Sequence, residues 1–385
     1  PYLPLPSIDC RCIMIFLLIL LISPVVSSSE ELLFVQTVYR HGDRTPRGTY
    51  PTDPYQEDFW GVPWGELTTL GMKQHFLQGQ RLKRLYVDKE KFMSSKYSRY
   101  DTSIRSADAP RCLQSAGAQM AGFYSGSPTH PTDLPDWPAD WTPLPIHTVP
   151  HNEDRELEAG VNCDRADQLL AQRVLKKNFL DFLASNWALF ADILIHSGGD
   201  YEANLDALEH IWDAISIEKG VYNLTLPDWI TDDFYKALGG AMEEALDYVD
   251  GGAGFDYPED TELLRLRAGF FLKEWIKNIN NAMGGNGLKY YSYSSHDSIV
   301  TDFMLLLGAK EKVIGKGNPD YAATVTCEVW RRSDGYYLKF LYSADAYSDF
   351  VPFTRFITGC PDADDFCPVD AFMARSQPFI PESAD

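Results

Sequence analysis

The chain interleaves short apolar runs, which suit strands, with longer stretches whose apolar residues recur at helical spacing. Residues 32–38, Leu-Leu-Phe-Val-Gln-Thr-Val, are typical of a strand buried on both faces of a parallel sheet. Further strands are expected at residues 96–105 and 289–294. Apolar residues three and four positions apart predict helices over residues 69–87 and 299–307.

The order of these elements predicts the class of fold. Residues 324–331 and 336–342 alternate around a Ser-Asp-Gly turn, which predicts a β-hairpin at the sheet edge. Strands alternating with helices predict an α/β fold with three α/β/α layers and a mostly parallel central sheet. We expect residues 29–150 and 283–385 to form this α/β domain, and residues 151–282 to form a smaller, mainly helical lobe over the active site.

Residues 40–46, Arg-His-Gly-Asp-Arg-Thr-Pro, directly follow the first strand. In open α/β sheets the ligand crevice lies at the carboxyl ends of the strands. Two neighbouring guanidinium groups oppose protonation of His41, and a neutral imidazole is a good nucleophile. Arg40 and Arg44 are suited to holding an oxyanion such as phosphate. The alternative is a strand-end histidine beside solvated arginines.

Two more strand-to-helix junctions carry candidate site residues. Arg105 lies between the second strand and the following helix, and His296–Asp297 end the third strand just before a helix. In a parallel sheet these junctions lie along one edge, so we expect their side chains to meet those of residues 40–46.

In this order, residues 40–46, Arg105 and the His296–Asp297 pair resemble the signature of the histidine acid phosphatases, branch 2 of the histidine phosphatase superfamily. The resemblance is strongest to the animal prostatic and lysosomal types and extends over about residues 31–381. It implies a phosphoglycerate-mutase-like α/β/α fold with an inserted helical lobe.

The resemblance also implies a role for each site residue. His41 would attack phosphorus and carry a transient phosphoryl group, and Asp297 would protonate the leaving alcohol and then activate water. The implied phosphate-binding residues are Arg40, Arg44, Arg105 and His296. No metal or other cofactor is expected, because the arginines would supply the positive charge.

The expected activity is therefore that of an acid phosphatase, a phosphoric monoester hydrolase of broad specificity. An acid pH optimum is expected because Asp297 must hold a proton although its reference pKa is ~3.9. Alternatives are a phytase or lysophosphatidate phosphatase of the same family, or a secreted, non-catalytic binding or antigen protein on this fold.

Charge restricts the partners of this protein. The 385 residues carry a net charge of −21, from 34 basic and 55 acidic side chains. This balance argues against nucleic acid and anionic membranes, and weakly against a highly phosphorylated inositol as substrate. Small phosphate monoesters are the expected partners, and the resemblance leaves a homodimer open.

The N-terminus predicts secretion. Arg11 precedes an apolar block at residues 13–22, and small residues follow, so residues 1–28 are expected to be a signal peptide region that is removed. The alternative is a buried helix. The block is shorter than the ~20 residues of a membrane span, and no second long apolar stretch predicts an anchor in the mature chain. We therefore expect a secreted or lysosomal protein.

Cysteines agree with an oxidising compartment. Cys360 and Cys367 flank a short acidic loop and are expected to form a disulfide, as a nearby pair does in the family. The remaining cysteines outside the signal region are left without an assigned pairing: Cys112, Cys163 and Cys327. A buried free thiol is the simplest interpretation of the first.

Other polar residues are candidates for a glycosylation site or a metal site. Asn223 begins an Asn-Leu-Thr sequon and is an expected glycosylation site. His147 and His151 are four residues apart, but the intervening Pro150 disfavours a shared helical face, so no metal site is expected. His75 is expected on the solvated face of its helix.

Overall fold

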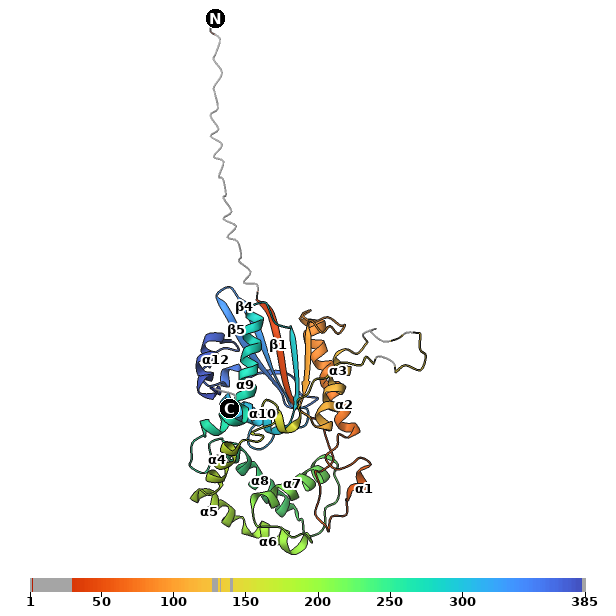
Figure 1. The fold of residues 1–385 in the computed structure, drawn as a ribbon, viewed down its shortest axis with the longest axis vertical. Helices are drawn as coiled ribbons and strands as arrows, with labels where there is room; N and C mark the ends of the chain where they lie inside the picture. The colour runs from red at the N-terminus through yellow and green to blue at the C-terminus, as the bar shows by residue number, and fades with distance from the viewer. Residues whose placement is uncertain (1, 3–29, 127–130, 132, 139–140, 383–385) are drawn as a thin grey trace.

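A computed structural model describes residues 2, 30–126, 131, 133–138 and 141–382 (Figure 1). Apart from Tyr2, the predicted signal region lies outside the described residues. The centre of the molecule is a seven-stranded sheet with the order β2-β3-β1-β4-β5-β6, in which β7 also pairs with β5. The strands are β1 (Glu31–Arg40), β2 (Thr102–Ser106), β3 (Tyr290–Ser295), β4 (Thr324–Arg332), β5 (Gly335–Ser343), β6 (Val351–Pro352) and β7 (Cys367–Pro368).

The sheet is mixed. Strand β3 pairs in parallel with both β1 and β2, whereas β4 runs antiparallel to β1 and begins an antiparallel half that continues through β5. The expected mostly parallel sheet is therefore parallel only across β2, β3 and β1. The expected hairpin is confirmed as β4 and β5, but β6 and β7 pair with β5 and cover what would have been the edge.

Helices cover both faces of the sheet, which confirms the layered α/β fold (Figure 1). On one face, α2 (Thr69–Lys83) and α3 (Pro110–Phe123) pack together and share a core with β2 and β3. On the other face, α9 (Thr261–Met283), α10 (Asp297–Leu306) and α12 (Val369–Ser376) enclose the largest core. The short elements are α1 (Glu57–Trp60), α11 (Lys310–Val313), η1 (Arg84–Lys89), η2 (His151–Glu153), η3 (Ser216–Val221), η4 (Thr354–Phe356) and η5 (Gln377–Phe379).

A helical lobe lies at the carboxyl ends of the parallel strands (Figure 1). Its helices are α4 (Asp164–Val174), α5 (Lys177–Ser185), α6 (Trp187–His196), α7 (Leu205–Ile215) and α8 (Asp232–Val249). It has its own core, in which Leu208 and Ile211 of α7 pack against Leu238 and Met242 of α8.

The expected lobe, residues 151–282, includes α9, whose packing instead places it with the sheet. Leu264, Phe271 and Trp275 of α9 are buried in the core that also contains Phe303 of α10 and Val329 of β4. The helical part over the crevice is thus α4 to α8, because α9 buries most of its apolar face in the core of the sheet and packs against α4 only through its first turns, at Leu263.

His75 of α2 does not lie on a solvated face, so that expectation was wrong. Helix α2 is packed against α3, which leaves the His75 side chain fully buried. Its Nε2 lies 3.1 Å from the carbonyl oxygen of Arg40 and donates to it, because a carbonyl can only accept. Burial lowers the pKa of His75 to about 3, so the ring is neutral.

A helix that crosses a bilayer needs about 20 mainly apolar residues. No single helix among the described residues is both long and apolar enough. Helices α5 and α6 reach the required length and hydropathy only together, across a bend of 53°.

Candidate active site

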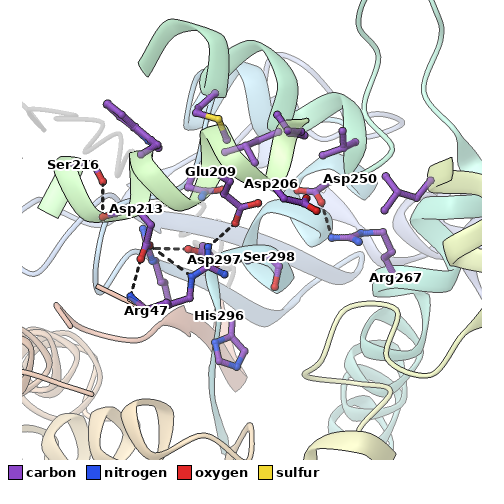
Figure 2. Close-up of a pocket in the computed structure, with 18 of the residues that line it drawn as sticks. Arg47, Asp206, Glu209, Asp213, Ser216, Asp250, Arg267, His296, Asp297 and Ser298 are labelled. Carbon is purple, nitrogen blue, oxygen red and sulfur yellow. Dashed lines mark hydrogen bonds and ion pairs between the residues drawn. The ribbon is translucent and has the colours of Figure 1, made fainter. Parts of the chain in front are cut away.

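Three chain segments that are far apart in sequence meet at the carboxyl ends of the parallel strands. They are the loop after β1, the first turn of α3 and the start of α10, and with residues of the lobe they line a cavity of about 1290 Å³. In Figure 2, Asp213 and Glu209 of α7 face Arg47, and Asp297 and His296 are labelled among the other residues that line the cavity. The structure thus brings residues of both parts of the chain to one site.

His41 stands at the centre of this site and is almost fully buried. Its Nδ1 lies 2.8 Å from the carbonyl oxygen of Gly42, so Nδ1 carries the proton and Nε2 keeps a free lone pair. Burial lowers the pKa of His41 well below its ordinary value, and Arg40, Arg111 and Arg44 lower it further. The ring is therefore neutral and nucleophilic at Nε2.

Gly42 is required by a close backbone approach. A Cβ atom at this position would lie only 2.5 Å from the carbonyl oxygen of Gly71 in α2. The loop after β1 therefore sits directly on α2, which fixes the position of His41.

Arg40 is held from three sides. Its Nη1 donates to the carbonyl oxygen of Pro319 at 2.6 Å, and its Nη2 lies 2.9 Å from Oδ2 of Asp297. Its guanidinium also lies 4.2 Å from the centre of the Tyr321 ring. These contacts hold the guanidinium at the carboxyl end of β1, where Arg40 and Tyr321 both line the cavity.

Arg44 is held by a residue of the lobe. Its two terminal nitrogens contact the carboxylate of Asp213 at 2.6 and 3.2 Å, an end-on bidentate pair with both side chains nearly buried. Asp213 also accepts the backbone N–H of Arg47 at 2.8 Å. Burial raises the pKa of Asp213, but Arg44 and Arg47 outweigh it and leave the pKa below its ordinary value. The carboxylate is therefore ionised.

His296 bonds through both ring nitrogens. Nε2 lies 3.2 Å from Oε1 of Glu158, and Nδ1 lies 3.2 Å from Nη2 of Arg111. A guanidinium can only donate, so Nδ1 accepts and Nε2 carries a proton. The ring centre is 5.7 Å from that of His41, so the two imidazoles are neighbours in the site.

Asp297 is the first residue of α10 and faces the cavity. Burial raises its pKa, but Arg40, Arg44, His296 and Arg47 together outweigh burial and leave the pKa well below its ordinary value. Without a bound anion this carboxyl is thus ionised. An anionic phosphate among the same guanidiniums would offset their charge, so its binding would raise the pKa of Asp297.

The structure does not bring Arg105 to the cavity. Its guanidinium is instead bound by Asp154 at 2.6 Å and by Glu156. The Asp154 side chain is fully buried and needs this charge for compensation. The sequence interpretation chose the wrong arginine because Arg105 lies within β2, where its side chain points toward the loop that carries these two carboxylates.

Arg111 occupies the place expected for Arg105. It lies in the first turn of α3, lines the cavity and contacts His296. Within the described residues its guanidinium has no carboxylate partner, which leaves it available to an anion. The signal in the sequence was Pro110, a typical first residue of a helix, which places Arg111 at the carboxyl edge of the sheet.

Two further site residues could not be found from local sequence patterns. Asp213 reaches Arg44 across 169 residues of chain, and Tyr321 comes from the loop before β4. Neither belongs to a recognisable motif, because their roles arise only from the approach of the lobe and of that loop.

Among the cysteines, Cys360 and Cys367 form the expected disulfide. Among the residues that the structure describes, Cys112, Cys163 and Cys327 have no disulfide partner, and Cys112 is buried as expected. The sulfur of Cys112 lies 3.7 Å from Nδ1 of His296, so this thiol packs behind the site.

The fold and the site together define an α/β protein with a buried, neutral histidine beside three guanidiniums that line one cavity. The sequence matches the histidine phosphatase superfamily (branch 2) over residues 31–343, and the chain belongs to this family. This confirms the family expected from residues 40–46 and the His296–Asp297 pair.

Curated relatives include acid phosphatases. Lysosomal acid phosphatase of Xenopus laevis is 31% identical over 368 residues, which cover 94% of this chain and 80% of the relative. Prostatic acid phosphatase of Bos taurus is 30% identical over 357 residues, which cover 91% of this chain and 86% of the relative.

Solved structures share the fold. A phytase from Klebsiella sp. ASR1 superposes with a TM-score of 0.61 at 17% identity, covering 92% of this chain and 98% of the phytase. A phytase from Citrobacter braakii superposes with a TM-score of 0.63 at 15% identity, and the match covers 91% of this chain and 98% of the phytase. At this identity the likeness concerns the fold alone.

Proposed function

We propose that this protein is an acid phosphatase that hydrolyses phosphate monoesters through a phosphohistidine at His41. The observation that carries the proposal is the neutral His41, with Nε2 free, beside guanidiniums that converge on one cavity. The names of the relatives, lysosomal and prostatic acid phosphatase, support the same activity.

In the first half-reaction, Nε2 of His41 attacks phosphorus while the bond from phosphorus to the alcohol oxygen breaks. The non-bridging oxygens would be held by Arg40, Arg44, Arg111 and His296. The three arginines are already oriented by Asp297, Asp213 and His296, so they would stabilise the charge of the transition state with little reorganisation, whereas His296 would have to release Glu158 to donate its Nε2–H. The guanidiniums supply the positive charge that a metal ion supplies in other phosphatases.

Asp297 would move the protons. With phosphate bound, its carboxyl is protonated and gives its proton to the leaving alcohol oxygen. In the second half-reaction the carboxylate takes a proton from water, whose oxygen attacks phosphorus as the bond to Nε2 breaks. Phosphate leaves, and His41 returns to its neutral form.

The proposal is tested by assaying hydrolysis of p-nitrophenyl phosphate near pH 5. The wild type is expected to turn over, and His41→Ala is expected to lose turnover while His196→Ala, on the lobe surface, retains it. Rapid quenching with labelled substrate is expected to give acid-labile, alkali-stable label on His41. A wild type without turnover would instead favour the non-catalytic binding alternative, and label on serine or cysteine would contradict the route.

We also propose that the chain enters the secretory pathway and is glycosylated at Asn223. Asn223 is exposed and follows η3 with a φ of +52°, an accessible position for a modifying enzyme. The disulfide between Cys360 and Cys367 fits an oxidising compartment. A shift in mass after treatment with an N-glycosidase, absent in Asn223→Gln, is the expected result.

A further inference from the structure

Glu158 places a carboxylate among the positive charges of the site. It lines the same cavity as His41 and Arg111, and its side chain is only 9% exposed. Its position is fixed by its neighbour Leu157, which is buried in the largest core and whose carbonyl oxygen accepts the hydroxyl of Ser295 at 2.8 Å. No proposed catalytic step gives this carboxylate a role.

A histidine lies on either side of Glu158. Its Oε1 is 3.2 Å from Nε2 of His296 and 3.1 Å from Nδ1 of His151 in η2. Burial raises the pKa of Glu158, but the two histidines outweigh burial and leave the pKa below its ordinary value, so the carboxyl is ionised at mildly acidic pH. An ionised carboxylate can only accept, so both ring nitrogens donate to one oxygen atom.

The hydrogen bond from His296 makes Glu158 a competitor of bound phosphate. Nδ1 of His296 accepts from Arg111, so this ring has one N–H to offer, and that N–H is directed at Glu158. One N–H makes one well-aligned hydrogen bond at a time. A phosphate oxygen must therefore replace the carboxylate as acceptor, beside a negative charge that repels it.

We propose that Glu158 makes the phosphate site discriminate by charge, so that singly charged phosphate groups are bound in preference to doubly charged ones. The inference rests on the proposed phosphatase function and names the ionic form of the substrate. A second negative charge on the phosphate meets the same carboxylate and gains no further N–H from His296. Phosphate monoesters lose their second proton near pH ~6, so this selection favours acidic conditions independently of Asp297.

Other charged and titratable groups also lie close to Glu158. Asp154 is already held in an ion pair, and burial raises the pKa of the Cys112 thiol, which is therefore neutral. Arg111 of α3 and Asp297 of α10 line the same cavity. A comparison of two anions at one pH does not vary the titration of any of these groups, so it isolates the charge of the anion.

The first test compares a dianion with a monoanion as inhibitors of p-nitrophenyl phosphate hydrolysis near pH 5. Sulfate and methyl sulfate are both fully ionised there. Glu158→Gln is expected to lower the inhibition constant of sulfate by about tenfold and that of methyl sulfate by no more than about threefold. In the control Glu153→Gln, which removes an exposed carboxylate outside the cavity lining, both constants are expected to stay unchanged. Equal effects of Glu158→Gln on the two inhibitors, or no effect, would overturn the proposal.

The second test uses His151, whose side chain is 65% exposed and can be truncated without opening the core. His151→Ala leaves the carboxylate of Glu158 bound to His296 alone, so sulfate is expected to bind about threefold more weakly. When Glu158 is already replaced by Gln, the same truncation is expected to have little effect, because the carboxylate is gone. Equal weakening in both backgrounds would show that His151 binds the anion directly, which would contradict the role given to Glu158.

Calorimetric titration with sulfate and methyl sulfate repeats the comparison without catalysis. If p-nitrophenyl phosphate is not hydrolysed, the phosphatase function fails, and the titrations still decide whether Glu158 discriminates by charge. Hydrolysis together with equal responses to the two anions would reject the charge selection alone. Thermal unfolding shows whether Glu158→Gln is folded. If it is not, His151→Ala decides, and sulfate binding as tight as in the wild type would overturn the proposal.

Discussion

At the scale of residues, two buried histidines differ in which ring nitrogen is left unprotonated and where it points. His41 and His75 are both neutral because burial lowers their pKa values. His75 donates Nε2–H to the carbonyl of Arg40 and does not line the cavity. His41 donates from Nδ1 to Gly42 and so presents an unprotonated Nε2 to the cavity. Neutrality alone is thus insufficient, and the hydrogen bond to the other nitrogen decides which atom can attack.

The two candidate arginines can be separated by substitution. Arg111→Ala removes a guanidinium from the phosphate site, so kcat/KM for p-nitrophenyl phosphate is expected to fall by about 10²–10³. Arg105→Ala instead leaves the buried Asp154 without its partner, so the free energy of unfolding is expected to fall by ~2 kcal/mol. Folded Arg105→Ala is expected to retain most of its activity. Steady-state kinetics and urea denaturation of both variants check this. A large loss of activity in Arg105→Ala, with little loss in Arg111→Ala, would instead favour Arg105 as the phosphate-binding residue.

At the scale of elements, α7 does more than cover the crevice. Residues four apart on a helix share a face, and Glu209 and Asp213 use one face of α7 to contact Arg47 and, through Asp213, Arg44. The lobe thereby holds Arg44, which lies in the loop after β1 and is one of the arginines proposed to bind phosphate. A lobe helix would in this sense belong to the proposed phosphate site.

This role of α7 predicts a specific loss. Asp213→Asn weakens the bidentate hold on Arg44, so the inhibition constant of inorganic phosphate and the KM are each expected to rise by about tenfold, equivalent to ~1.4 kcal/mol. Asp206→Asn, two turns earlier on α7 and without an arginine contact in the described structure, is the matched control. Inhibition assays at pH 5 check the effect. A weakened thermal stability with unchanged phosphate affinity would show that Asp213 is only structural.

At the scale of the whole molecule, we expect the folded state to be more stable at mildly acidic pH than at neutral pH. The net charge of −21 falls in magnitude as carboxylates take up protons, which reduces self-repulsion. The buried carboxyl of Glu218 also makes the folded state more stable at acidic pH. The Glu218 side chain is fully buried, and its carboxyl oxygens have no hydrogen-bond partner within the described part of the chain. Burial, together with nearby Asp53, raises the pKa of Glu218 to about 9.

The raised pKa of Glu218 makes stability depend on pH. The folded chain keeps this proton, whereas the unfolded chain releases it above about 4.5. The stability from this group is therefore full below that pH and is lost as the pH rises toward about 9, by up to about 1.4 kcal/mol per pH unit. Glu218→Gln is expected to lose less stability than the wild type between pH 5 and 7. Urea denaturation of both proteins at pH 5 and pH 7 checks this. An equal loss of stability in Glu218→Gln and in the wild type would contradict it.

The sequence by itself predicted what depends on neighbours along the chain. The apolar run before residue 40 defined β1, and the Ser-Asp-Gly turn defined the β4–β5 hairpin. The spacing of Cys360 and Cys367 indicated their disulfide. The His41 motif and the His296–Asp297 pair were visible because strand ends in a parallel sheet share one edge, so local order was enough to bring them together.

Tertiary structure alone decided the rest, because these features depend on contacts between distant segments. It placed Arg111 rather than Arg105 at the cavity, since two loop carboxylates bind Arg105. It brought Asp213 to Arg44, buried His75 beneath the site and assigned α9 to the sheet. It also extended the cavity between α4, α5, α7 and α8 of the lobe, which no local pattern aligns. Burial and long-range pairing set which charges remain free, and the sequence pattern does not encode them locally.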